Sequence, residues 1–147
     1  MILIVLKTLG LYKKAGKNPV NQKAIIDFWA SEAEESLHVA DHLFEKKDYS
    51  YALFFGHLAV EKILKAVFVK NKNEAVPRSH NLLRLAKEAN IEITEEQKHT
   101  LIRITAFNLE TRYPDYKKEF RKKCTLQFTA SELKKIKEVF IWLKSNL

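Results

Sequence analysis

Apolar residues recur at helical spacing along most of the chain. Between residues 21 and 46 they stand three or four positions apart, as on one face of an α-helix: Ile25, Phe28, Trp29, Ala33, Leu37, Ala40, Leu43 and Phe44. After a short EKKDYS break, Asp48 can cap a second helix that extends to about Lys70 and is apolar almost all round. Such a helix is central in its domain or is buried against a second subunit.

Two more helices are predicted in the next third of the chain. NKNEAVPRS (71–79) is the clearest loop, and Ser79 is expected to cap a short helix from His80 to about Asn90. Thr94 and Gln97 have the spacing of a capping box, which opens a fourth helix. That helix is predicted to end at Arg112 or Tyr113, because the following proline disfavours helical backbone at the residue before it.

The last part of the chain is predicted to hold one helix. Residues 114–128 are basic and are expected to be irregular. Thr129 and Glu132 then form a second capping-box pattern, which opens a helix to about Ser145. The pattern as a whole predicts an all-α fold, an up-down bundle of about five helices over residues 21–147. Residues 1–20 do not fit it and are interpreted as an N-terminal extension, with flexibility expected.

Charge and composition add two constraints. Three glycines and three prolines in 147 residues indicate few turns and long elements. The net charge of +8 is uneven: residues 24–111 carry 11 basic and 14 acidic side chains, whereas residues 112–147 carry 10 basic and 4 acidic ones. Basic ends favour contact with phosphate, nucleic acid or an acidic partner, or they serve solubility alone.

The sequence gives no sign of a membrane segment or of a metal site. It contains no run of 18 apolar residues and no secretory signal pattern. Cys124 is the single cysteine, so a reducing cytoplasmic location is expected. The spacing of cysteine and histidine fits no usual metal site, and no cofactor is indicated.

The first candidate cluster lies on the second helix, where His57, Glu61 and Lys65 are four residues apart and Lys62 stands beside them. Polar groups on an apolar helix need partners or water. One interpretation is an ordinary Glu61–Lys65 helix pair worth about 0.3–0.5 kcal/mol. The other is a polar seam that faces a cleft or a dimer axis.

The second candidate cluster lies at the end of the fourth helix. Asn108 and Arg112 are four residues apart, and Tyr113 and Tyr116 can stack on a base. An arginine fork suits a phosphate, but an arginine at a helix end also stabilises the terminal carbonyls. His80, at the start of the third helix, either packs on the second helix or lines the same cleft as Arg112.

Three short motifs, taken together, resemble a known family. They are Ala59-Val60-Glu61-Lys62-Ile63-Leu64-Lys65-Ala66, then Ser79-His80-Asn81-Leu82, then Arg112-Tyr113-Pro114-Asp115. Their order and helical context are similar to those of the HEPN domain family over about residues 24–145. The resemblance implies a helical bundle, often a homodimer, that binds nucleotides and is often encoded beside a minimal nucleotidyltransferase as its partner subunit or toxin counterpart.

Many HEPN proteins are RNases in which an arginine is followed, after four to six residues, by a histidine. In this chain the corresponding positions after Arg112 are Lys117, Lys118 and Glu119. A lysine with an ordinary pKa of about 10.4 stays protonated at neutral pH and is a poor general base. This departure from the family's pattern therefore favours binding over cleavage.

The predicted function is a nucleotide- or phosphate-binding HEPN protein with no catalytic residues. Its predicted site residues are Arg112, Lys62, Lys65, His80, Glu61, Tyr113 and Asn108. Two alternatives stay open. One is an RNase toxin of a toxin–antitoxin pair, which requires His57 or His80 to approach Arg112. The other is a non-enzymatic dimeric interaction module built on the second helix.

Overall fold

The computed structural model describes residues 21–147 as six helices without a strand. They are α2 (Gln22–Glu45), α3 (Tyr49–Lys72), α4 (Leu82–Glu88), α5 (Glu95–Arg112), α6 (Pro114–Lys123) and α7 (Leu126–Lys144). The all-α helical bundle is confirmed. The proposed N-terminal extension, residues 1–20, lies outside the described residues. Within 21–147, no helix is both long and apolar enough to cross a bilayer.

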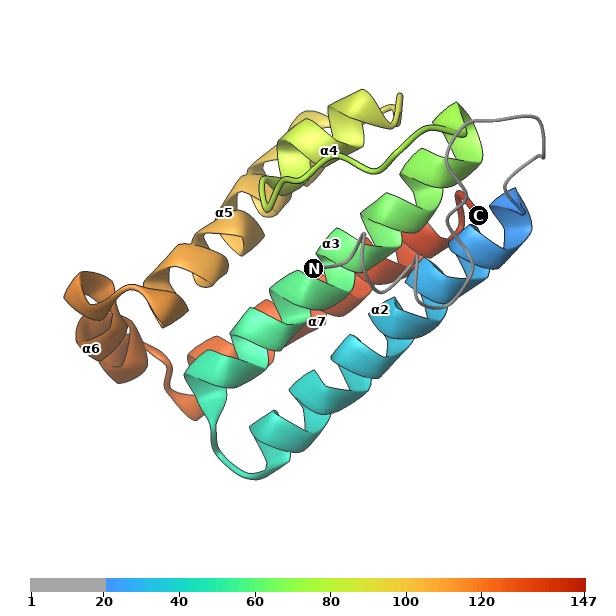
Figure 1. Ribbon diagram of the computed structural model, residues 1–147. Helices are drawn as coiled ribbons and strands as arrows, with labels where there is room; N and C mark the ends of the chain where they lie inside the picture. The colour runs from blue at the N-terminus through green and yellow to red at the C-terminus, as the bar shows by residue number, and fades with distance from the viewer. Residues whose placement is uncertain (1–20) are drawn as a thin grey trace.

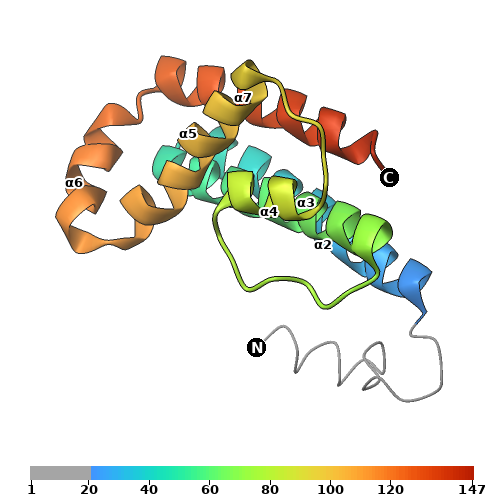
Figure 2. The same cartoon turned by 90° about the horizontal axis from the view of Figure 1, so that it is seen from above.

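The centre of the bundle is α3, which contacts each of the other five described helices. It runs antiparallel to α2 and α5 and alongside α7, and α4 lies across α3 and α5 (Figure 1). Turned by 90°, the same arrangement shows α6 at the end of the bundle away from the C-terminus (Figure 2). Because α3 is covered within one chain, its apolar character on all sides needs no second subunit.

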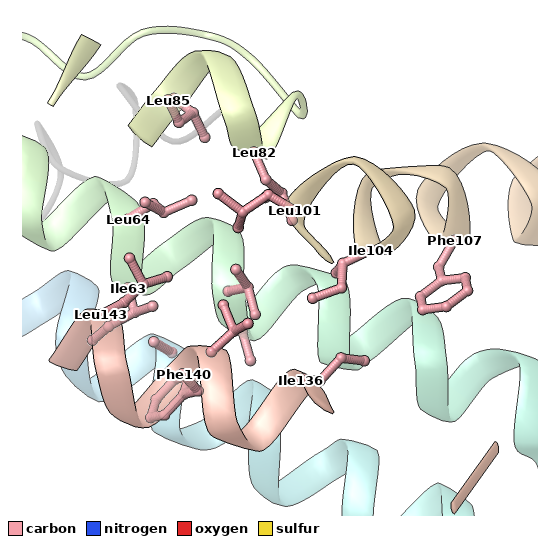
Figure 3. Packing of buried hydrophobic residues seen from close by; sticks show 14 of the residues in the cluster. Ile63, Leu64, Leu82, Leu85, Leu101, Ile104, Phe107, Ile136, Phe140 and Leu143 are labelled. Atoms are coloured by element: carbon pink, nitrogen blue, oxygen red, sulfur yellow. The ribbon is translucent and has the colours of Figure 1, made fainter. Parts of the chain in front are cut away.

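The core forms where α3, α4, α5 and α7 meet. Figure 3 shows side chains from these four helices directed toward one another: Ile63, Leu64, Leu82, Leu85, Leu101, Ile104, Phe107, Ile136, Phe140 and Leu143. Gly56 of α3 permits a close approach of α7, since a Cβ there would stand 2.7 Å from the Ile136 Cδ1 atom. Because these apolar side chains pack against α3, the polar residues of α3 lie on the part of the helix that they do not cover.

The capping box of α5 is present as predicted. The Thr94 hydroxyl accepts from the Gln97 N–H at 3.2 Å, and the Gln97 side chain accepts from the Thr94 N–H at 2.9 Å. The α4 prediction was correct in place but wrong in its cap. Asn81 caps the helix through the Arg84 N–H, whereas the Ser79 hydroxyl accepts from the Asn81 N–H.

Residues 114–128 were predicted to be irregular, and this was wrong. Pro114 stands in the first turn of α6, where its fixed φ suits a helix start. Asp115 in the first turn and a basic last turn complement the helix dipole. Phe120 is buried and stacks on Phe107 of α5 with ring centroids 5.7 Å apart, which holds α6 on the bundle.

The start of α7 was also predicted too late. The helix begins at Leu126, and Thr125 caps it through the Phe128 N–H at 3.2 Å. Thr129 and Glu132 therefore lie inside the helix and form no capping box. Glu132 instead accepts two hydrogen bonds from Arg103 of α5, at 2.7 and 2.6 Å, and so joins α5 to α7.

Candidate functional site

The stripe His57, Glu61 and Lys65 is a buried seam on α3, and not a surface helix pair. The three residues are 0%, 4% and 4% exposed. Ionised groups removed from water need close partners of opposite charge. The Glu61–Lys65 helix pair that the sequence allowed is present, with 2.6 Å between Lys65 Nζ and Glu61 Oε1, but it is buried.

Glu61 is the centre of the seam. Its Oε1 accepts from Lys65 Nζ at 2.6 Å, and its Oε2 lies 2.9 Å from His80 Nδ1, which comes from the loop before α4. Burial is the largest influence on the Glu61 pKa and raises it, but Lys65 and His80 together outweigh it and the pKa lies below its usual value. Glu61 is thus a buried carboxylate held in the charged form. The Lys65 ammonium also lies 5.0 Å from the centroid of the Trp29 ring.

His57 supports the backbone of His80. Its Nε2 is 3.0 Å from the His80 carbonyl oxygen, and since a carbonyl can only accept, Nε2 carries the proton. Burial lowers the pKa of His57, and the charge of Arg112 adds to that effect. His57 is therefore neutral at pH 7, and its Nδ1 has no partner among residues 21–147. A residue this buried orients His80 without meeting a ligand.

His80 is the part of the seam that reaches the surface. Its side chain is 57% exposed although its Nδ1 is fixed on Glu61. An ionised carboxylate requires Nδ1 to donate, which leaves Nε2 as the basic nitrogen of a neutral ring. The arrangement is an exposed imidazole oriented by a buried carboxylate, which is suited to accept a proton or, when protonated, to bind an anion.

Arg112 is exposed at the C-terminal end of α5. Its Nε donates to the Asn108 carbonyl at 3.3 Å, which is the helix-terminus role that the sequence allowed. The guanidinium pairs with no carboxylate among residues 21–147, and it lies 6.0 Å from the centroid of the half-exposed Tyr113 ring. Asn108 itself is buried, so it contributes its carbonyl. Among residues 21–147 the remaining donors of Arg112 have no hydrogen-bond partner, so an anion can accept from them.

Lys62 lies apart from this seam. Its Nζ donates to Ser36 Oγ at 2.8 Å and lies 3.4 Å from Glu32 Oε2, and both partners are on α2. Of the predicted site residues, the structure therefore brings Glu61, Lys65 and His80 into contact and keeps Lys62 on the α2 side. His57 was noticed for its spacing with Glu61 but was not included in the predicted site. Within residues 21–147 no cluster of metal-binding side chains occurs.

Comparison with known proteins identifies the family. The family model described as HEPN domain matches residues 26–146. The chain belongs to the HEPN domain family. A solved structure of TT1696 from Thermus thermophilus is similar in fold, with a TM-score of 0.72 at 19% identity, over 83% of this chain and 98% of that one. A search of curated proteins found no match.

The positions that correspond to the HEPN RNase motif can now be located on the fold, although the histidine is absent from them. Arg112 ends α5, and the positions where the histidine would stand, Lys117, Lys118 and Glu119, lie on α6. Lys117 Nζ is 5.6 Å from the centroid of the Tyr51 ring at the start of α3. The imidazole on which the Arg112 charge acts is instead that of His57 on α3, and His57 contacts the carbonyl of His80 in the loop before α4.

Proposed function

We propose that this HEPN protein binds a phosphate group of a nucleotide or RNA on the His80–Arg112 face, the surface made by His80, Arg112 and Tyr113. The observation that carries the proposal is the exposed His80 imidazole, which is fixed by buried Glu61. The charge of Arg112, which pairs with no carboxylate among residues 21–147, acts on His57 next to it. Two groups that can donate to phosphate oxygens, His80 in the loop before α4 and Arg112 at the end of α5, suit a phosphate.

Each residue of the predicted site has a role in this proposal. The Arg112 fork donates to phosphate oxygens, His80 Nε2 adds a contact, and the Tyr113 ring supports a base or sugar. Glu61 orients His80, and the Asn108 carbonyl positions Arg112. Lys65 is buried and Lys62 is bound to α2, so we assign Lys65 to holding Glu61 charged and Lys62 to joining α2 to α3.

A titration with a labelled short RNA and with mononucleotides tests this proposal. Arg112→Gln should weaken binding by at least about tenfold, since a hydrogen bond to a charged group contributes about 1.5–3 kcal/mol. Lys134→Gln, an exposed α7 substitution with the same loss of charge, is the control and should change affinity little. Equal losses in both variants would mean that only net charge matters, and absence of binding by the wild type would remove the proposal.

RNA cleavage is a second candidate, because the Glu61–His80 contact is the geometry of a general base. In this reaction His80 Nε2 takes the proton of a ribose 2′-hydroxyl, whose oxygen attacks the adjacent phosphorus. The 5′-oxygen leaves and takes a proton from water, which gives a 2′,3′-cyclic phosphate. Gel analysis of RNA after incubation decides: cleavage by the wild type that His80→Asn abolishes supports this function, and intact RNA leaves binding alone.

We further propose that the protein works as a homodimer or with a minimal nucleotidyltransferase, as membership in the HEPN family implies. The interaction-module alternative rested on α3 as a dimer core, and the coverage of α3 by its own chain removes that support. Light scattering after size exclusion measures the oligomeric state. A monomer at all concentrations would contradict the homodimer.

A further inference from the structure

Two histidines lie side by side on the outer face of α2. His38 and His42 are four residues apart, so they stand on the same side of the helix, and both are exposed. The centroids of their rings are 4.1 Å apart, and the ring planes are inclined at 58°. The pair is separate from the His80–Arg112 face, because α2 contributes no residue to that face.

The packing of α2 explains why this pair faces solvent. The helix packs on α3 through a buried row that includes Trp29, Ala33 and Ala40. Each residue advances an α-helix by about 100°, which places positions 38 and 42 on the side opposite to this row. Because both histidines belong to one 24-residue helix, the backbone fixes the separation of their Cα atoms.

The ring nitrogens of His38 and His42 have no oxygen partner among residues 21–147. The histidine rings that contact oxygen atoms in this part of the chain are those of His57 and His80. A neutral imidazole has one nitrogen with a lone pair, which accepts a hydrogen bond or binds a metal ion. Two such nitrogens therefore stand next to each other on a surface that ions in solution can reach.

The distance between the two rings suits one metal ion bound by both. An imidazole nitrogen binds zinc at about 2.0–2.1 Å, so two nitrogens at a right angle around one ion are about 3 Å apart. Rings with centroids 4.1 Å apart reach this separation by rotation about their side-chain bonds, without a change in the helix.

The spacing of the pair has a precedent in helical zinc sites. In the H-E-x-x-H motif, two histidines at positions i and i+4 of one helix bind the metal, and the glutamate is the general base. In this chain Val39 follows His38, so the motif's carboxylate is replaced by an apolar side chain. The arrangement therefore supports metal binding and lacks the base of a metalloprotease.

The charges on the outer face of α2 favour a cation. Glu35 lies three residues before His38, and Glu45 lies three residues after His42, so both stand on the same side of the helix. Both carboxylates are exposed, and neither is in an ion pair among residues 21–147. Lys46, four residues after His42, is a nearby cation that opposes the bound ion and lowers its affinity.

We propose that His38 and His42 together bind one divalent transition-metal ion on the surface of α2, with one nitrogen from each ring and water in the remaining positions. Imidazole suits Cu²⁺, Ni²⁺ and Zn²⁺, and the general order of stability makes Cu²⁺ the tightest of the three. Mg²⁺ and Ca²⁺ prefer oxygen ligands and are excluded. Because no third metal-binding side chain joins the pair within residues 21–147, the ion exchanges with solution and is not a buried structural metal.

The test is titration of the full chain with Cu²⁺, followed by the NMR signals of the histidine rings, which a nearby paramagnetic ion broadens. The His38 and His42 signals should broaden together and saturably. His38→Asn and His42→Asn should each weaken this binding by at least about tenfold, because the remaining imidazole loses its partner in the chelate. His99→Asn, which removes a single exposed histidine of α5, is the matched control and should leave the binding unchanged.

A joint response that either α2 substitution abolishes would support the proposal, as would recovery of both signals when excess Zn²⁺ displaces the copper. It would be overturned if His80 and His99 broadened at the same copper concentration, because each imidazole would then bind alone. The absence of saturable broadening, or displacement of the copper by Mg²⁺, would also overturn it. Circular dichroism of the two α2 variants should match that of the wild type, which separates a lost ligand from an unfolded helix.

Discussion

Glu61→Gln is the substitution that most directly tests the buried seam. It keeps the shape of the side chain but removes the negative charge that Lys65 Nζ contacts at 2.6 Å. Both residues are 4% exposed, so the Lys65 charge would be left buried with no carboxylate among residues 21–147 to pair with it. Breaking a buried pair by removing one partner costs about 3–5 kcal/mol.

Restoring charge balance should reverse most of this loss. In Glu61→Gln/Lys65→Met neither charge remains, and replacement of a whole buried pair by groups of similar size is often neutral or stabilising. We therefore expect the double variant to lie within about 1–2 kcal/mol of the wild type. The remaining cost reflects the weaker hydrogen bond from His80 Nδ1 to a neutral amide.

Urea unfolding at pH 7.5 provides the free energies, on condition that the slope with urea is the same in all variants. Asp27→Asn, which breaks the exposed Lys23–Asp27 pair of α2, is the control and should cost about 0.3–0.5 kcal/mol. A cost of less than about 1 kcal/mol for Glu61→Gln, or equal destabilisation of the single and double variants, would contradict a buried Glu61–Lys65 ion pair.

Three further outcomes are expected. Burial lowers the pKa of His57, so below about pH 6.5 the unfolded chain takes up a proton that the folded chain does not, and the free energy of unfolding falls by up to about 1.4 kcal/mol per pH unit. In His57→Asn this pH dependence should be absent from urea unfolding between pH 7 and 5.5. The same pH dependence in the variant and the wild type would contradict the lowered pKa. Thr94→Ala removes the α5 capping box and should lower the unfolding free energy by about 1 kcal/mol, whereas an unchanged urea midpoint would show that the cap contributes nothing. Burial raises the pKa of Cys124 to about 11, so its alkylation at pH 8 should be at least about a hundredfold slower than that of a free thiol, and a comparable rate would mean that the thiol is exposed.

The sequence was sufficient for the long helices because their burial repeats every three to four residues. The α2, α3 and α5 helices bury one face or nearly all faces, and their ends carry polar caps such as Thr94. The α6 helix was missed because PDYKKEFRKK buries Phe120 as its one large apolar side chain, which sets no period. Its stability comes from contact with Phe107, which is distant in sequence.

The candidate site could likewise be predicted only in part. Spacing on α3 placed His57, Glu61 and Lys65 on one stripe, and the structure confirms that Lys65 contacts Glu61. The spacing could not predict hydrogen-bond partners that come from other helices or loops. His80 reaches Glu61 from a loop 19 residues later, and Lys62 turns to Glu32, 30 residues earlier. Periodicity gives the face of a helix, whereas the partner of a charged group depends on tertiary packing.

The most direct test is an NMR titration that follows the His80 imidazole and the Arg112 guanidinium together. It shows whether both residues bind the same phosphate. The protein is titrated with a mononucleotide and with a short RNA, and Lys134 is followed as an exposed cation elsewhere. We expect the His80 and Arg112 signals to shift saturably with the same dissociation constant, while the Lys134 signal stays constant. The proposal is contradicted if neither signal moves, or if the two residues report different affinities.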